Sequence, residues 1–295
     1  MKMPPFSYHR PDTVDEVLEL LGRYGSDAKV LAGGQSLLPV MALRLGQPDH
    51  LIDISRVNEL GHLRLNDATV HLAANVTHAT AEDSSLVATE LPLVAAAMPW
   101  IGHRAIRNRG TVCGSLAHGD PAAELPAVAL ALEATLVVRS VRGERTIPAS
   151  QFFLGFLTTA LEPDELLCEV RVPVTSPWAT SAVHEVARRH GDYAMVGLAT
   201  VVEQSGAGVV EHAALSFFAV GSTPVRARAA EAALVGQPLR PEAIAAAVSC
   251  ARHELDPPTD NHASSQYRRH VAGIVLERTL RSMSQTHTTL PGAVA

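Results

Sequence analysis

Cysteine is scarce in this chain. Its three cysteines, Cys113, Cys168 and Cys250, lie far apart, and no CxxC pair occurs among its 295 residues. An odd, scattered set of thiols suits neither a disulfide scaffold nor a zinc site. It also falls short of the ligand set that an iron–sulfur cluster normally requires. Any such cluster needed for function must therefore be held by another chain.

Long apolar runs and an excess of basic charge are also lacking. The apolar stretches are short and are broken by charged residues, Gly or Pro, so we expect no segment to span a bilayer. The formal net charge is -6, whereas a general nucleic-acid binder is basic over its working face. The first residues, Met1 to Pro11, contain no apolar signal region. We therefore expect a cytoplasmic protein with no membrane span that does not bind nucleic acid.

Metal-binding and aromatic patterns are sparse. None of the 14 histidines shows the HExxH spacing of a metal-binding helix, and we predict no metal site. Aromatic residues make up only 4% of the chain, which leaves Trp100, Trp178 and Tyr193 as the candidates for stacking on a planar ligand.

Apolar residues, by contrast, are abundant enough for a sizeable core. They make up 47% of the chain against 18% charged residues, and the length suits two packed domains. Thr13 and Glu16 have the spacing of a capping box, and the helix that they open ends at Gly22 and Gly25. The further elements expected in the first domain are strands over 28–32, 50–54, 134–139 and 165–172, helices over 37–45, 77–98 and 122–132, a hairpin over 63–75 and a loop over 102–119.

The segment Thr175-Ser176-Pro177 is the expected domain boundary. We predict a first domain over 1–176, with lobes of about 1–57 and 58–176, a second over 177–285, and a disordered tail over 286–295. The second domain reads as strands followed by helices, which is typical of an α+β fold with the helices on one side of a sheet. Its expected strands are 182–188, 198–203 and 209–220, and its expected helices are 225–234, 241–252 and 263–283.

A first candidate site lies where a strand runs into two glycines and a helix. The residues are Ala32, Gly33, Gly34, Gln35, Ser36 and Leu37. Glycine tolerates positive φ, and backbone N–H groups at a helix start favour an anion. Ser36 could cap the helix and donate to a phosphate oxygen. Taken alone, this segment is better explained as an ordinary tight turn.

A second candidate turn contains Thr111, Cys113, Gly114 and Ser115. Thr111 and Ser115 can donate to phosphate or ribityl oxygens, and Asp120 and Glu124 further on can accept from hydroxyl groups. Asp120 could also be a simple helix N-cap. Two phosphate-binding turns in one domain favour a dinucleotide with a pyrophosphate.

These segments resemble a known family. The blocks AGGQSLLP (32–39), RNRGTVCGSLAHGDPAAELPA (107–127) and RRHGDYAMVG (188–197) are similar to the FAD-binding subunit of xanthine oxidase-type molybdenum hydroxylases, in particular the carbon monoxide dehydrogenase medium chain and its relatives. The late block ASSQYRR (263–269) resembles that family's C-terminal helix signature. The resemblance extends from about Pro5 to about Leu280.

The resemblance implies a fold and a set of cofactor contacts. The first domain would be a two-lobed FAD-binding domain of the vanillyl-alcohol oxidase (PCMH) type, and the second the small α+β domain of this subunit. The residues of both turns would hold the FAD pyrophosphate, and Glu124 its polar chain. Ile101, Leu161 and Tyr193 would lie around the flavin. Relatives usually have Gly and Asn where Cys113 and Ser115 stand, and a positive φ at Cys113 would be strained.

The resemblance also implies a division of labour. Molybdenum cofactor would belong to a large partner subunit and two [2Fe-2S] clusters to a small one, in a dimer of heterotrimers, and FAD on this chain would pass electrons to an external acceptor. We expect no catalytic acid or base here. Two alternatives stay open: a stand-alone flavin-dependent oxidoreductase, and a non-catalytic nucleotide-binding protein.

Overall fold

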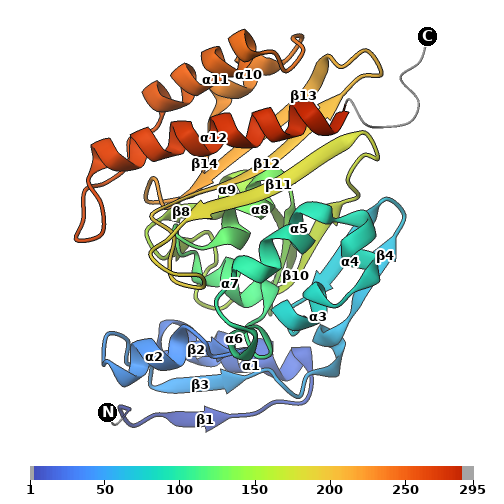
Figure 1. Ribbon diagram of the computed structural model, residues 1–295. Coiled ribbons are helices and arrows are strands. Elements are labelled where there is room, and N and C mark those ends of the chain that lie inside the picture. Colours follow the sequence, from blue (N-terminus) through green and yellow to red (C-terminus); the bar gives the residue numbers. More distant parts are fainter. Residues whose placement is uncertain (1–2, 288–295) are drawn as a thin grey trace. The chain divides into compact units, whose positions relative to one another are not determined.

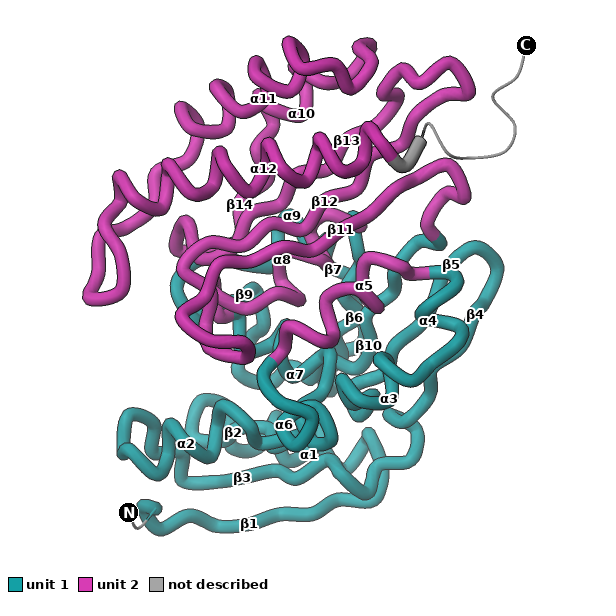
Figure 2. Tube along the Cα trace, viewed as in Figure 1, with its two compact units in different colours: residues 1–90, 102–119, 133–174 teal, residues 91–101, 120–132, 175–295 magenta. Residues whose placement is uncertain are grey.

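The computed structural model describes residues 3–287, which form two compact units (Figure 2). The first unit contains the chain up to Glu90 together with Gly102–Gly119 and Glu133–Val174. The second contains Leu91–Ile101, Asp120–Leu132 and the chain from Thr175 onward. Two short early segments therefore belong to the C-terminal unit.

A small parallel sheet opens the first unit, with the strand order β1-β3-β2 (Figure 1). Helix α1 contacts β3 of this sheet, and its buried face consists of Val14, Val17, Leu18 and Leu21. The predicted capping box is confirmed, because the Thr13 hydroxyl accepts from the Glu16 N–H and the Glu16 side chain bonds back to the Thr13 N–H. The elements are β1 (Ser7–His9), α1 (Val14–Tyr24), η1 (Gly25–Asp27), β2 (Ala28–Leu31), α2 (Leu37–Ala42), β3 (His50–Asp53) and η2 (Asn58–Gly61).

An antiparallel sheet forms the rest of the first unit, with the strand order β4-β5-β10-β6-β7. The predicted hairpin is confirmed, and Asp67 at its tip takes a positive φ of 51°. The strands are β4 (Leu63–Asn66), β5 (Thr69–Ala73), β6 (Thr135–Ser140), β7 (Gly143–Pro148) and β10 (Leu166–Pro173), and β8 (Phe153–Gly155) pairs separately with β9 (Thr158–Thr159). The helices are α3 (His78–Glu82), α4 (Ser85–Glu90), α6 (Arg104–Arg107), α7 (Val112–His118) and α9 (Ala149–Phe152).

The segment 102–119, expected as a loop, contains the helices α6 and α7, so that prediction is wrong. The Thr111 hydroxyl caps α7 by accepting from the Gly114 N–H at 3.0 Å. Gly119 closes α7 in the left-handed conformation, with a φ of 64°. Both helices are too short to display a helical repeat of apolar residues.

The second unit is built on one antiparallel sheet, with the strand order β11-β12-β13-β14. Alternate residues of β12 and β13, such as Leu198, Leu215 and Phe217, are fully buried in a core with the helices α10, α11 and α12. Helices α5 and α8, from the two early segments, also contact this sheet. The elements are β11 (Ala179–Val186), β12 (Val196–Gln204), β13 (Val210–Phe218), β14 (Val225–Arg226), α5 (Pro92–Ala97), η3 (Met98–Trp100), α8 (Glu124–Ala131), α10 (Arg228–Leu234), α11 (Pro241–Glu254) and α12 (Ser265–His287).

The end of the chain is described only as far as α12, which reaches His287. Most of the predicted disordered tail, residues 288–295, lies outside the described residues. Among the helices of the described chain, none combines the length and the apolar character needed to cross a membrane.

Candidate functional site

The two candidate turns touch each other in the first unit. The first leaves β2 at Leu31 and enters α2 at Leu37. A Cβ placed on Gly33 would lie 2.1 Å from the carbonyl oxygen of Arg109 and 2.7 Å from the Cα of Gly110. A Cβ on Gly114 would lie 3.8 Å from the Cβ of Ala32. The two glycine-containing segments, far apart in sequence, therefore form one feature, which we call the paired turns (residues 32–37 and 109–115).

The first of the paired turns presents unused backbone donors. In the part of the chain that the structure describes, the N–H groups of residues 33–36 donate to no acceptor. Gly34 has a φ of 71°, which a side chain would strain. Ser36 occupies the N-cap position of α2, but its hydroxyl makes no capping bond, so it stays available to a ligand. Consecutive free N–H groups beside a surface without side chains form the kind of concavity that binds a phosphate.

The second of the paired turns is organised around Thr111. Because the Thr111 hydroxyl accepts from the Gly114 N–H, a Cβ on Gly114 would lie only 2.6 Å from Thr111 Oγ1. Within residues 3–287 the hydroxyl hydrogens of Thr111 and Ser115 find no acceptor, so both can donate to a ligand. The donors on this side are therefore hydroxyl groups more than backbone amides.

Cys113 lies beneath this turn without backbone strain. It belongs to α7, does not take a positive φ, and is 2% exposed. Its thiol donates to the Leu72 carbonyl at 3.5 Å, and burial raises its pKa far above the usual value for a thiol. The strain anticipated at this position is absent, and the protonated, enclosed thiol acts as a small packing residue.

Behind the paired turns lies His78, a residue that the sequence did not single out. A Cβ on Gly110 would lie 3.0 Å from its ring, and its backbone N–H donates to the Gly110 carbonyl at 2.8 Å. Burial lowers the pKa of His78 to about 4, so the ring is neutral at ordinary pH. No spacing pattern marks a lone histidine at a helix start, so composition alone could not identify it.

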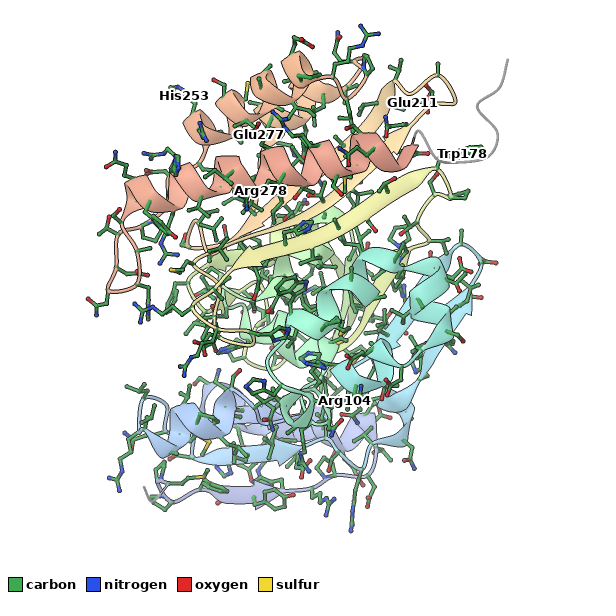
Figure 3. All side chains as sticks on the ribbon, in the orientation of Figure 1. Arg104, Trp178, Glu211, His253, Glu277 and Arg278 are labelled. Carbon is green, nitrogen blue, oxygen red and sulfur yellow. The ribbon has the colours of Figure 1, made fainter. Side chains whose placement is uncertain are left out.

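Two arginines that precede the second of the paired turns, Arg104 and Arg107, pair with acidic residues of the first unit. Arg104, labelled in Figure 3, donates to Glu82 at 2.7 Å and also pairs with Asp83. Arg107 is 9% exposed and holds both oxygens of Glu82, at 2.9 and 3.0 Å. These side chains fix α6 against α3 and do not form a free phosphate-binding surface.

The remaining predicted cofactor contacts are distributed over both units. Leu161 lies in the first unit, after β9. Ile101, Asp120, Glu124 and Tyr193 lie in the second unit, where Ile101 is 9% exposed and Tyr193 68% exposed. The structure brings the two turns together within the first unit.

Asp120 and Glu124 lie just before and at the start of α8, but Asp120 does not cap this helix. Asp120 accepts from the Ala122 N–H at 2.9 Å and forms a tight turn, whereas α8 begins only at Glu124, with Ala123 as the N-cap. Burial raises the pKa of Glu124 to about 7, with a smaller contribution from the charge of Asp120. Asp120 is therefore not the N-cap of α8.

A second acid in the same unit, Glu185 on β11, was missed by sequence reasoning. Both of its carboxylate oxygens are buried and find no hydrogen-bond partner in the described chain. Burial raises the pKa of Glu185 to about 8, and Glu124 adds to the shift. One acidic residue in a strand carries no sequence signal of its own.

Comparison with known families defines the class of protein. A model described as the FAD binding domain in molybdopterin dehydrogenase matches residues 4–175, and one described as the CO dehydrogenase flavoprotein C-terminal domain matches residues 181–283. The chain therefore belongs to the family of FAD-binding flavoprotein subunits of molybdopterin dehydrogenases.

Individual relatives agree over nearly the whole chain. The alpha subunit of the 6-hydroxypseudooxynicotine dehydrogenase complex of Paenarthrobacter nicotinovorans is 42% identical over 280 residues, 95% of each chain. The carbon monoxide dehydrogenase medium chain of Hydrogenophaga pseudoflava is 39% identical over 279 residues, 95% of this chain and 97% of that one. A solved structure of carbon monoxide dehydrogenase from Hydrogenophaga pseudoflava, which lacks the Mo-pyranopterin moiety, superposes with a TM-score of 0.94 at 41% identity and covers 97% of this chain and 99% of that chain. The predictions of the family, of the α+β fold and of an FAD-dependent oxidoreductase subunit are confirmed.

The residues of the paired turns fit the group that the family implies. A pyrophosphate is an anion with many acceptor oxygens and no need for a side-chain base. The free N–H groups of residues 33–36 and the O–H groups of Ser36, Thr111 and Ser115 supply donors for these oxygens. The absence of a side chain at Gly33 and Gly34 allows the close backbone approach that this requires.

Proposed function

We propose that this chain holds FAD by its pyrophosphate at the paired turns and relays electrons between partner subunits and an external acceptor. The observation that carries the proposal is the row of unpaired N–H groups at residues 33–36, set against the hydroxyl donors of Thr111 and Ser115. FAD, when bound, supplies the electron chemistry. The residues of this chain bind it, orient it and exclude water.

In this proposal each predicted residue contacts a particular part of FAD. The N–H groups of Gly33, Gly34, Gln35 and Ser36 donate to phosphate oxygens, with Ala32 and Leu37 lining the turn. Thr111, Gly114 and Ser115 complete the phosphate contacts over the buried Cys113. Asp120 and Glu124 bond the polar chain, and Ile101, Leu161 and Tyr193 pack on the flavin. A carboxyl such as Glu124, with a pKa of about 7, can both donate to and accept from a hydroxyl group.

The proposal includes a heteromeric, cytoplasmic complex. Relatives are named as a medium chain or as one subunit of a dehydrogenase complex, which supports partner chains for this protein. We propose a large subunit with molybdenum cofactor, a small subunit with two [2Fe-2S] clusters, and assembly as a dimer of heterotrimers. The scattered cysteines, two of them buried, agree with clusters held on another chain.

A ligand titration tests the binding step. The purified chain, stripped of flavin, is titrated by calorimetry with FAD, with FMN and with ADP. We expect FAD to bind tightly and FMN, which has one phosphate and no adenylate, to bind at least about tenfold more weakly. Equal affinity for FMN and FAD would contradict a pyrophosphate site at the paired turns.

Purification of the native complex tests the relay. We expect a yellow complex that releases FAD on denaturation and contains molybdenum and iron on co-purifying chains. A yellow chain that turns over a substrate without partners would favour a stand-alone flavin oxidoreductase. A colourless chain without affinity for FAD would leave only a non-catalytic nucleotide-binding protein.

A further inference from the structure

Arg268, near the start of α12, is a buried arginine whose side chain bonds three other segments. It is 4% exposed, and its guanidinium spans three separate segments of the second unit. Nη1 donates to the carbonyl of Met195 and, at 3.0 Å, to the carbonyl of Ala219, while Nη2 donates to Asp260 Oδ2 at 2.6 Å. A planar guanidinium presents several donors in a fixed geometry, which a lysine ammonium does not.

The Met195 carbonyl lies at the end of the loop that carries Tyr193. This loop, residues 187–195, joins β11 to β12, and the Met195 N–H donates to the Val186 carbonyl at 2.8 Å where the strands begin to pair. Farther out, His190 stacks on Trp100 with the ring centroids 5.9 Å apart and the planes 11° from parallel. The loop is therefore held near its tip by an aromatic stack and at its base by Arg268.

The Ala219 carbonyl connects Arg268 to a second segment. Ala219 follows β13 and has a φ of 60°, a left-handed conformation that costs energy for a residue with a side chain. Its N–H donates to the Pro121 carbonyl at 2.7 Å, in the turn that Asp120 forms ahead of α8. With both its N–H and its C=O bonded, Ala219 is held in this conformation and joins Arg268 to the Asp120 turn.

We propose that Arg268 is a positioning residue that fixes the Tyr193 loop directly and the Asp120 turn through Ala219. Its side chain bonds only protein groups of the described chain, and its effect on the flavin rests on the function proposed above, in which Tyr193 and Asp120 contact FAD. Arg268 lies within the sequence block 263–269, to which no task has been assigned so far.

Asp260 supplies the charge that allows the guanidinium to be buried. Its other oxygen, Oδ1, accepts from the N–H groups of His262 and Ala263 at 2.8 and 3.0 Å. These bonds and the Arg268 charge outweigh the effect of burial and lower the pKa of Asp260 to about 2. The ion pair therefore persists over the ordinary pH range, and the arrangement is fixed and does not switch with pH.

A neighbouring arginine offers a matched control. Arg269 also bonds one carbonyl, that of Leu255 at 3.0 Å, and one aspartate, Asp256 at 3.2 Å. Its side chain is 38% exposed, and neither bond involves the Tyr193 loop or Ala219. Arg268→Lys and Arg269→Lys therefore make the same chemical change on the same helix turn with different connections.

Hydrogen exchange on the flavin-free chain tests the positioning itself. In Arg268→Lys we expect amides of residues 187–195 and 219–221 to exchange at least about tenfold faster, while the central amides of α12 keep wild-type rates. Arg269→Lys should leave both segments unchanged. Unchanged exchange in 187–195, or a uniform rise across the whole unit, would overturn the proposal. If Arg268→Lys fails to fold, Asp260→Asn, which keeps the guanidinium, should accelerate the same two segments by a smaller factor.

A double-mutant cycle with bound FAD tests the consequence for the flavin. Tyr193→Ala should change the fluorescence and the visible spectrum of bound flavin in the wild-type background. In Arg268→Lys, where the loop is released, the same substitution should add little, and the coupling should be absent with Arg269→Lys. Fully additive effects would reduce Arg268 to a general stabiliser of the fold. If the wild-type chain binds no FAD, the proposed function fails, and the exchange experiment alone decides whether Arg268 holds the loop.

Discussion

Replacing Gly33 by alanine should separate the paired turns. The added Cβ would lie 2.1 Å from the Arg109 carbonyl oxygen and 2.7 Å from the Gly110 Cα. Both are backbone atoms, so no side chain can rotate away, and one turn must move by about 1 Å to restore a normal contact. Overpacking of this kind typically costs about 1–3 kcal/mol, and we expect a value near the upper end.

The same displacement should also weaken FAD binding. Hydrogen bonds to a charged group contribute about 1.5–3 kcal/mol each. Loss of one or two of the donors at residues 33–36 therefore predicts a loss of FAD affinity of roughly 100-fold. Calorimetric titration gives the affinity, and thermal unfolding without FAD gives the stability change.

Gly61→Ala is the matched control in the same unit. A Cβ on Gly61 meets nothing within 4 Å, and its φ is not positive. We expect FAD affinity equal to that of the wild type and a stability change within about 0.5 kcal/mol. If Gly33→Ala binds FAD as the wild type does, the paired turns do not hold the pyrophosphate.

Three further predictions concern acids, thiols and strand contacts. Folding raises the pKa of Glu185 from 4.5 to about 8. The contribution of this carboxyl to stability is therefore fully present at a pH below its unfolded pKa of 4.5, and it is lost as the pH rises through about 8. Glu185→Gln should therefore flatten the decline in stability between pH about 5 and about 8, by roughly 1–2 kcal/mol after allowance for partial exposure, as urea unfolding at several pH values would measure. Cys113, which is buried, should resist iodoacetamide in the folded protein while the half-buried Cys250 reacts first, and peptide mass spectrometry would detect the opposite order. Gly197→Ala should cost about 2–3 kcal/mol in urea unfolding, because its Cβ would lie 2.0 Å from the fully buried ring of Phe218; an unchanged midpoint would show that this ring can move.

Local chemistry was enough to predict several elements. The Thr13–Glu16 capping box and the hairpin with Asp67 at its tip follow from side chains that bond, or bend, their own neighbouring backbone. The apolar run expected as a strand over 209–220 forms β13, in which alternate residues such as Leu215 and Phe217 share one core. Signals of this kind lie within a few residues of each other, so the sequence displays them directly.

Elements that depend on distant partners were missed. Helix α6 depends on ion pairs of Arg104 and Arg107 with Glu82, more than twenty positions away. Strand β7 (Gly143–Pro148) is polar and exposed except at Ile147, and only its pairing with β6 makes it a strand. Residues 225–226, expected as the start of a helix, likewise form β14 by pairing with β13. Tertiary contacts overrode the local preference in each case.

The candidate site shows the same division. Two glycine-rich turns were visible in the sequence, but the contact of Gly33 with Arg109 was not, because nothing in either segment encodes the other. His78, Glu185 and Arg268 are single residues whose roles come from what surrounds them. The family resemblance identified the cofactor, whereas the physical reason for Gly33 lies in its contact with a segment more than seventy residues away.

Because the chain crosses between its two units several times, the protein cannot be cut into two fragments that each contain one complete unit. Helix α8 is apolar on every side, with all residues from Leu125 to Ala131 buried, and it packs on β12 and β13. A fragment that stops at the end of the FAD-binding family match, near residue 175, would contain α5 and α8 but lack the sheet on which they pack. Such a fragment should aggregate unless residues 176–287 are supplied in trans. During synthesis, α5 and α8 can pack fully only after the later strands of their unit have been made.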